Sequence, residues 1–171
     1  ALASVSAVCT STSQRTQIAP PALNQRLHSL SRFVGRWCGT GKGEPGNSIA
    51  ERRHMSVLSG RFIDVRNTST YAPQAANLKG EVHDDVGYLS FDNARKLFVL
   101  GIRTEGFVNQ PAATTPDFTG DRVVFASEAF ENIPASMEAR ESYTLTSADT
   151  FEIAEDGVTF QIYSHNTLMR V

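Results

Sequence analysis

The sequence predicts an all-β fold, a single up-and-down antiparallel β-barrel of about ten strands with a short N-terminal helix closing its base. Beyond residue 34 the chain is a series of short strand-like segments separated by turn residues, with no strong helical period among them. Consecutive hairpins of this kind are typical of an up-and-down barrel. The 171 residues contain no internal repeat, and they suffice for one domain with a sizeable core.

The segment before the barrel is expected to be a flexible tail at residues 1–22, followed by the barrel domain at residues 23–171. Residues 1–13 carry no charge and are mostly small or hydroxyl side chains, as in a disordered linker. The same segment also fits the end of a secretory signal peptide. A periplasmic or secreted location and a cytoplasmic one therefore both stay open.

A short amphipathic helix is expected after the tail. Leu23, Leu27 and Leu30 recur at helical spacing and are followed by Phe33. One side of this helix is apolar, so it would plug the base of the barrel.

The strands are expected in order along the chain, each bounded by turn residues. Ser59-Gly60 and Asp92-Asn93 are turn sequences that join two of the hairpins. Two longer segments, 72–79 and 110–120, are loop-like in composition and would frame the end where a ligand enters. The expected strands are 34–42, 49–58, 61–71, 86–91, 96–104, 122–130, 139–146, 150–154 and 158–169.

Two widely separated residues support a closed barrel. The only tryptophan lies in Phe33-Val34-Gly35-Arg36-Trp37, at the start of the first strand, and Arg170 ends the last strand. This Gly-x-Trp and late arginine resemble the signature of the calycin superfamily, which includes lipocalins, fatty-acid-binding proteins and nitrobindins. The resemblance implies that Trp37 fills the barrel floor and that Arg170 lies across its ring, a cation–π contact worth about 0.5–2 kcal/mol.

Further phrases resemble a group of uncharacterised bacterial calycin-like proteins. They are Glu105 to Gln110 and Glu131 to Tyr143. The resemblance implies a shared barrel and supplies no reaction, so an enzyme is not the favoured interpretation.

The predicted function is the binding of a small, largely apolar ligand in the barrel cavity. Such cavities combine apolar walls with a few polar groups, and the strands carry many charges. We expect inward-facing arginines, Arg66 and Arg103 above all, to meet a ligand carboxylate, with acidic partners available nearby. The candidate ligand-binding residues are Arg66, Arg103, Glu128, Arg140, Glu141 and His165.

Haem is a second candidate ligand, because nitrobindins bind haem through a histidine in the final stretch of the chain. Here the corresponding candidate for the iron ligand is His165, although alternation sets it on the less apolar strand face. Haem-dependent chemistry, acid–base catalysis by Glu128 or Glu141, and a structural barrel without ligand remain the alternatives. No cofactor is required by the sequence.

Composition limits the partners. Sixteen basic and eighteen acidic residues give a net charge of −2, without the basic excess of nucleic-acid-binding proteins. No apolar run is long enough to span a membrane as a helix, and a homodimer is left open.

The segment Glu81-Val82-His83-Asp84-Asp85 is expected to be a solvated loop. Cys38 is expected to be a buried thiol, with a disulfide to Cys9 as the alternative.

Overall fold

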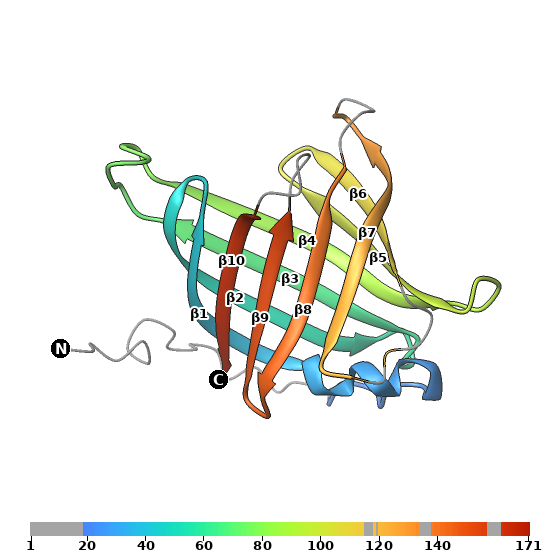
Figure 1. Ribbon diagram of the computed structural model, residues 1–171. Helices are drawn as coiled ribbons and strands as arrows, with labels where there is room; N and C mark the ends of the chain where they lie inside the picture. The colour runs from blue at the N-terminus through green and yellow to red at the C-terminus, as the bar shows by residue number, and fades with distance from the viewer. Residues whose placement is uncertain (1–18, 115–117, 119, 134–137, 157–161) are drawn as a thin grey trace.

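The computed structural model contains ten antiparallel strands that form one closed barrel, with a short helix across one end (Figure 1). The structure describes residues 19–114, 118, 120–133, 138–156 and 162–171. Each strand pairs with its neighbours along the chain, and β1 pairs with β10 to close the barrel. The all-β barrel fold is therefore confirmed, while residues 1–18 of the tail expected at residues 1–22 lie outside the described residues.

The elements follow one another with short connections. Their bounds are η2 (Gln25–Phe33), β1 (Gly35–Gly43), β2 (Gly46–Val57), β3 (Phe62–Tyr71), β4 (Glu81–Asp92), β5 (Leu97–Thr104), β6 (Phe107–Ala113), β7 (Arg122–Glu131), β8 (Arg140–Ser147), β9 (Thr150–Asp156) and β10 (Ile162–Arg170).

Two strands differ from the sequence-based expectation. β6 occupies part of the segment expected to be a loop, and it contains Pro111. The pairing of β6 with β7 shifts register between Gln110 and Pro111, and such an irregularity lets a strand accommodate a residue that has no N–H to donate. β4 begins at Glu81, so the expected loop at residues 81–85 is also strand.

The helix η2 is a 3₁₀ helix, and its apolar residues follow that geometry. Leu27, Leu30 and Phe33 are spaced three apart and all three are buried. A 3₁₀ helix has three residues per turn, so these side chains lie along one line facing the barrel core. Asn24 caps the N-terminus, where its side chain accepts hydrogen bonds from two backbone N–H groups. The expected plug is therefore present.

Trp37 and Arg170 meet where the barrel closes. They are register partners on β1 and β10, and the guanidinium carbon lies 4.1 Å from the centre of the indole ring. Trp37 is 1% exposed and packs edge-on against Phe151. The expectation of a buried tryptophan under an arginine is confirmed.

The same two residues also complete the C-terminal end of η2. The indole N–H donates to the Phe33 carbonyl at 2.9 Å, and Arg170 donates to the carbonyls of Val34 and Arg32 at 2.8 and 2.9 Å. Carbonyls at a helix C-terminus have no partner within the helix. These side chains therefore join the plug to both edges of the barrel seam.

Gly35 is required at the seam. Its φ is +147°, and a Cβ there would overlap the guanidinium of Arg170. The group that excludes a side chain there thus comes from β10, near the opposite end of the chain.

Cys38 is buried and disulfide-bonded. This corrects the expectation of a free thiol, and the chain's other cysteine, Cys9, lies outside the described residues. Within the part of the chain that the structure describes, no helix is long and apolar enough to cross a membrane.

Replacing Trp37 by Ala is expected to lower the free energy of unfolding by about 3–5 kcal/mol, because a fully buried ring is lost and a cavity remains. Urea denaturation followed by circular dichroism measures the change. Met169→Ala is the control, since Met169 is the exposed neighbour of Arg170 and should cost about 0.5 kcal/mol or less. A loss below about 1 kcal/mol for Trp37→Ala would contradict the role given to the seam.

Candidate functional site

The barrel interior is mainly apolar at the end covered by η2 and mainly polar toward the opposite end. Strand alternation turns every second side chain inward, so β2 and β3 each contribute a run of inward residues. The inward residues of β2 are Ser48, Ala50, Arg52, His54 and Ser56, and those of β3 are Ile63, Val65, Asn67, Ser69 and Tyr71, all buried. On β3 the change from apolar to polar occurs between Val65 and Asn67.

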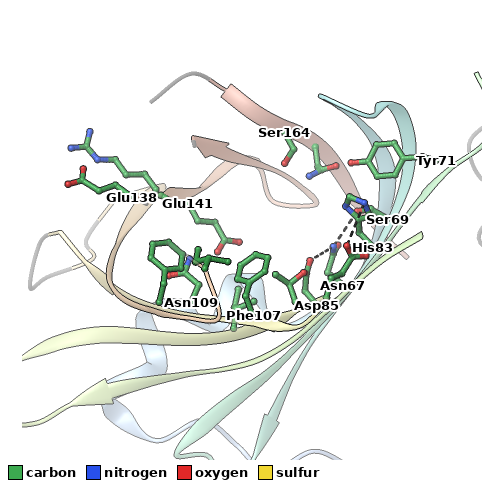
Figure 2. A pocket seen from close by; sticks show the side chains of 18 residues that line it. Asn67, Ser69, Tyr71, His83, Asp85, Phe107, Asn109, Glu138, Glu141 and Ser164 are labelled. Carbon is green, nitrogen blue, oxygen red and sulfur yellow. Dashed lines mark hydrogen bonds and ion pairs between the residues drawn. The ribbon is translucent and has the colours of Figure 1, made fainter. Parts of the chain in front are cut away.

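A cavity of about 250 Å³ occupies the polar half of the barrel (Figure 2). Its lining combines amide, hydroxyl and carboxylate side chains with aromatic and aliphatic ones. The lining residues are Asn67, Ser69, Tyr71, His83, Asp85, Ile102, Thr104, Glu105, Phe107, Asn109, Phe130, Ile133, Glu138, Ala139, Arg140, Glu141, Ser164 and Asn166.

Arg52 lies at the boundary between the core and the cavity floor. It is 3% exposed, and it pairs with Glu141 across the barrel at 3.3 Å. Its guanidinium also donates to the Tyr143 hydroxyl at 3.1 Å and to Asn67 Oδ1 at 3.4 Å. A buried guanidinium needs such partners because leaving it unpaired would cost several kcal/mol.

Asp85 carries the second carboxylate of the floor. Its side chain accepts a 2.8 Å hydrogen bond from the Asn67 amide, which also donates to Ser69 at 3.2 Å. Asn67 thus links Asp85 to Arg52, and a continuous polar network spans β2, β3, β4 and β8.

Glu141 is 6% exposed, and burial raises the pKa of its carboxyl above the ordinary value. The Arg52 charge and hydrogen bonds from Tyr143 and Arg52 act in the opposite direction, but burial outweighs them. The charge of Asp85 adds to the increase. A carboxyl with a raised pKa in a cavity is a common feature of sites that bind ligands or transfer protons.

His54 lies between this network and the end of η2, and its imidazole ring is kept neutral. Burial and the neighbouring Arg52 charge lower its pKa from 6.5 to about 3. Its Nδ1 lies 3.1 Å from the Phe33 carbonyl, which also accepts from Trp37. The ring stacks on Tyr143 with the centroids 5.8 Å apart, so His54 connects the plug to the floor of the cavity.

The two arginines expected to face inward do not do so. Arg66 lies on the outer face of β3, where it pairs with Asp64 at 3.2 Å and its side chain is 46% exposed. Arg103 is exposed beside the inward residue Ile102. Alternation explains both positions, because each arginine is adjacent in sequence to a buried apolar residue.

Two other candidates also lie outside the cavity. Glu128 is exposed and pairs with Arg95 at 2.7 Å. His165 is exposed on the outer face of β10, 3.5 Å from Glu152, because its neighbours Ser164 and Asn166 point inward. The histidine proposed to ligate haem iron therefore does not fit a haem in the cavity. Of the six candidates, Arg140 and Glu141 line it.

The sequence reasoning missed the centre of the network. Arg52, Asn67 and Asp85 were not selected, although the buried parity of Ile63 and Val65 continues to Asn67 and could have identified it. The sequence pattern predicts a solvated loop for His83 and Asp85, whereas they line the cavity from β4. The described residues contain no group of three or more ligating side chains able to hold a metal ion.

The mouth of the cavity also differs from expectation. Glu105 lies in the turn between β5 and β6, and Ile133 and Glu138 lie between β7 and β8. The segment 72–79, which was expected to frame the entrance, contributes no lining residue.

Comparison with known proteins identifies a structural neighbour. The crystal structure of Rv2717c from M. tuberculosis superposes with a TM-score of 0.67 at 19% sequence identity, covering 87% of this chain and 99% of that chain. Identity at this level establishes the shared barrel fold alone. No protein-family model matches the chain, and no curated protein is significantly similar in sequence.

Acid should destabilise the barrel through His54. Between pH 6.5 and about 3 the unfolded chain binds a proton at His54 that the folded protein excludes, so stability falls as the pH falls. Between pH 6.5 and 5 this lowers the free energy of unfolding by about 1.6 kcal/mol, because the full slope of about 1.36 kcal/mol per pH unit is reached only below the unfolded pKa. Urea denaturation at several pH values should show a shallower dependence for His54→Gln than for wild type. His28→Gln, at an exposed position, should keep the wild-type dependence; an unchanged slope in His54→Gln would refute the assignment.

Glu141 is expected to titrate above the ordinary pH range of a glutamate, because burial disfavours its charged form. Carboxyl ¹³C NMR across a pH series measures this directly. Asp85→Asn should lower the pKa of Glu141, since a neighbouring negative charge is removed. Asp84→Asn is the matched control, because Asp84 is exposed on the opposite face of the same strand. Equal effects of the two substitutions would contradict the arrangement.

Proposed function

We propose that this barrel is a binding protein that holds a small organic ligand in its cavity. The observation that carries the proposal is the cavity itself, whose lining combines hydrogen-bonding side chains with apolar ones. Ile102, Phe107 and Phe130 supply surface for the apolar part of a ligand. Asn67, Asp85 and their neighbours would orient its polar end. This combination is usual for small-molecule sites.

The cavity volume favours a compact ligand. About 250 Å³ lies just below the range of about 300–1,000 Å³ that is usual for drug-sized ligands. A short amphipathic molecule therefore suits the site better than a long acyl chain or haem. Membership of the calycin superfamily, which the Gly-x-Trp signature and Arg170 resemble, forms part of the same proposal.

Acid–base catalysis is a second candidate function, and the buried Glu141 favours it. A buried carboxyl with a raised pKa is a candidate general acid, and Asp85 lines the same cavity. Glu128, the other residue considered for this role, lies outside the barrel. Loss of turnover in Glu141→Gln with binding retained would favour an enzyme over a binding protein.

The haem alternative is tested by hemin titration. Of the four histidines in the chain, His83 lines the cavity. A Soret band that His83→Ala abolishes and His165→Ala preserves would favour haem binding in the cavity. The absence of such a band would leave the compact organic ligand as the better proposal.

A blocked cavity should lose its ligand. The neutral probe 2-phenylethanol is expected to bind with a dissociation constant of about 1 mM or tighter, equivalent to about 0.45 kcal/mol for each of its nine or so non-hydrogen atoms. Thr104→Trp places a large ring in the cavity wall and should abolish saturable binding by NMR titration. Arg103→Trp, next to it on the outer face, should leave binding unchanged. Equal binding by wild type and Thr104→Trp would contradict the proposal.

A further inference from the structure

We propose that the cavity selects a ligand bearing a protonated amine, with Asp85 as the principal partner of the ammonium group. This inference rests on the proposed binding function and specifies the chemical class of the ligand. It reverses the expectation, drawn from the sequence, of a ligand carboxylate that meets an inward arginine.

The charges around the cavity favour a cation. Among the described lining residues four are acidic, Asp85, Glu105, Glu138 and Glu141, whereas the basic ones are His83 and Arg140. His83 itself lies 3.4 Å from Glu81 and 3.9 Å from Glu105. A ligand carboxylate would therefore enter a predominantly negative site, and an ammonium would be attracted to it.

The buried guanidinium of Arg52, next to the cavity floor, already has partners. Arg52 donates to Glu141, Tyr143 and Asn67, and it does not line the cavity. Its positive charge compensates the carboxylate of Glu141. Asp85 has a different environment, because its hydrogen-bond partner among the described residues is the neutral amide of Asn67. Asp85 thus presents a negative charge to the cavity, and no cationic side chain among the described residues is paired to it.

The remaining polar atoms of the floor also favour a donor. Asn109 lines the cavity, and its Oδ1 is buried with no hydrogen-bond partner in the described structure. A buried acceptor without a partner is costly unless a ligand or water supplies the hydrogen. An ammonium group has three N–H donors and no acceptor, so it suits a floor rich in carboxylate and amide oxygens.

The aromatic wall adds a second attraction for the same group. Phe107 lines the cavity near Asp85 and Asn109, as Figure 2 shows, and Tyr71 lies on the far side of the space. Aromatic faces attract cations as well as apolar groups. A short aryl-alkyl amine would place its ring against this wall and its ammonium on the floor.

The test compares three probes that share a phenyl ring and differ in the polar end. They are 2-phenylethylamine, 2-phenylethanol and phenylacetate, titrated by calorimetry into the full-length protein at pH 7, where an alkylamine is protonated. We expect the amine to bind at least about tenfold more tightly than the alcohol, as a charge-assisted hydrogen bond allows. The alcohol should in turn bind more tightly than the acid.

Substitution of the carboxylate tests the role of Asp85. Asp85→Asn keeps the shape of the side chain and should remove most of the amine's advantage while leaving the affinity for 2-phenylethanol nearly unchanged. Asp84→Asn, on the outer face of the same strand, should keep the wild-type preference. Thermal melts check that each variant is folded, and the comparison of probes on wild type requires no variant.

The outcomes of these titrations distinguish three claims: the amine preference, the role of Asp85 and the binding function itself. If the acid or the alcohol binds wild type as tightly as the amine, the amine inference is overturned and the binding function stands. If the amine preference survives in Asp85→Asn, the assignment of Asp85 is overturned. If none of the three probes binds, the proposed function falls and the inference falls with it.

Discussion

The end of η2 is the point on which the rest of the structure depends. The carbonyls of Arg32, Phe33 and Val34 would have no partners in an isolated helix, and here Trp37, His54 and Arg170 face them. Two of these side chains come from β1 and β10, which meet at the barrel seam, and the third comes from β2, which pairs with β1. The carbonyls at the end of η2 therefore gain their hydrogen bonds only when the barrel closes, so the two sets of contacts form cooperatively.

The seam also determines where the cavity lies. Trp37 pairs in register with Arg52 on β2 as well as with Arg170 on β10. The aromatic plug of Phe33, Trp37 and Phe151 fills the barrel up to that level, and the polar network begins directly above it. The aromatic cluster cannot move along the barrel axis without breaking its contacts with η2. The position of the cavity floor along that axis is therefore fixed.

Local patterns were sufficient to predict most of the fold. Short alternating segments and turn residues predicted the strands, and the spacing of Leu23, Leu27 and Leu30 predicted the plug. β6 was missed because a proline usually argues against a strand, and only the register shift beside Pro111 accommodates it. The start of β4 was missed because its charged residues were interpreted as a loop, although His83 and Asp85 face a polar cavity.

The candidate site was harder to predict, for two reasons. Alternation alone would have excluded Arg66, since it shares the outer face with Asp64 while Ile63 and Val65 face inward. Strand β5 gave a weaker signal for Arg103, because Leu97 to Leu100 are apolar on both faces. Alternation narrows the candidates, but it does not say which inward charge has a partner.

That second question depends on contacts across the barrel. Arg52 and Glu141 lie on β2 and β8, which are not neighbours in the sheet and are brought together only when the strands close. Their separation in sequence carries no local signal. A buried arginine nevertheless needs a carboxylate partner. The sequence analysis applied this requirement to Arg66 and Arg103, whereas in the structure it applies to Arg52. Once Glu141 satisfies Arg52, the arginine no longer needs an anionic ligand, and Asp85 becomes the charge that a ligand can meet.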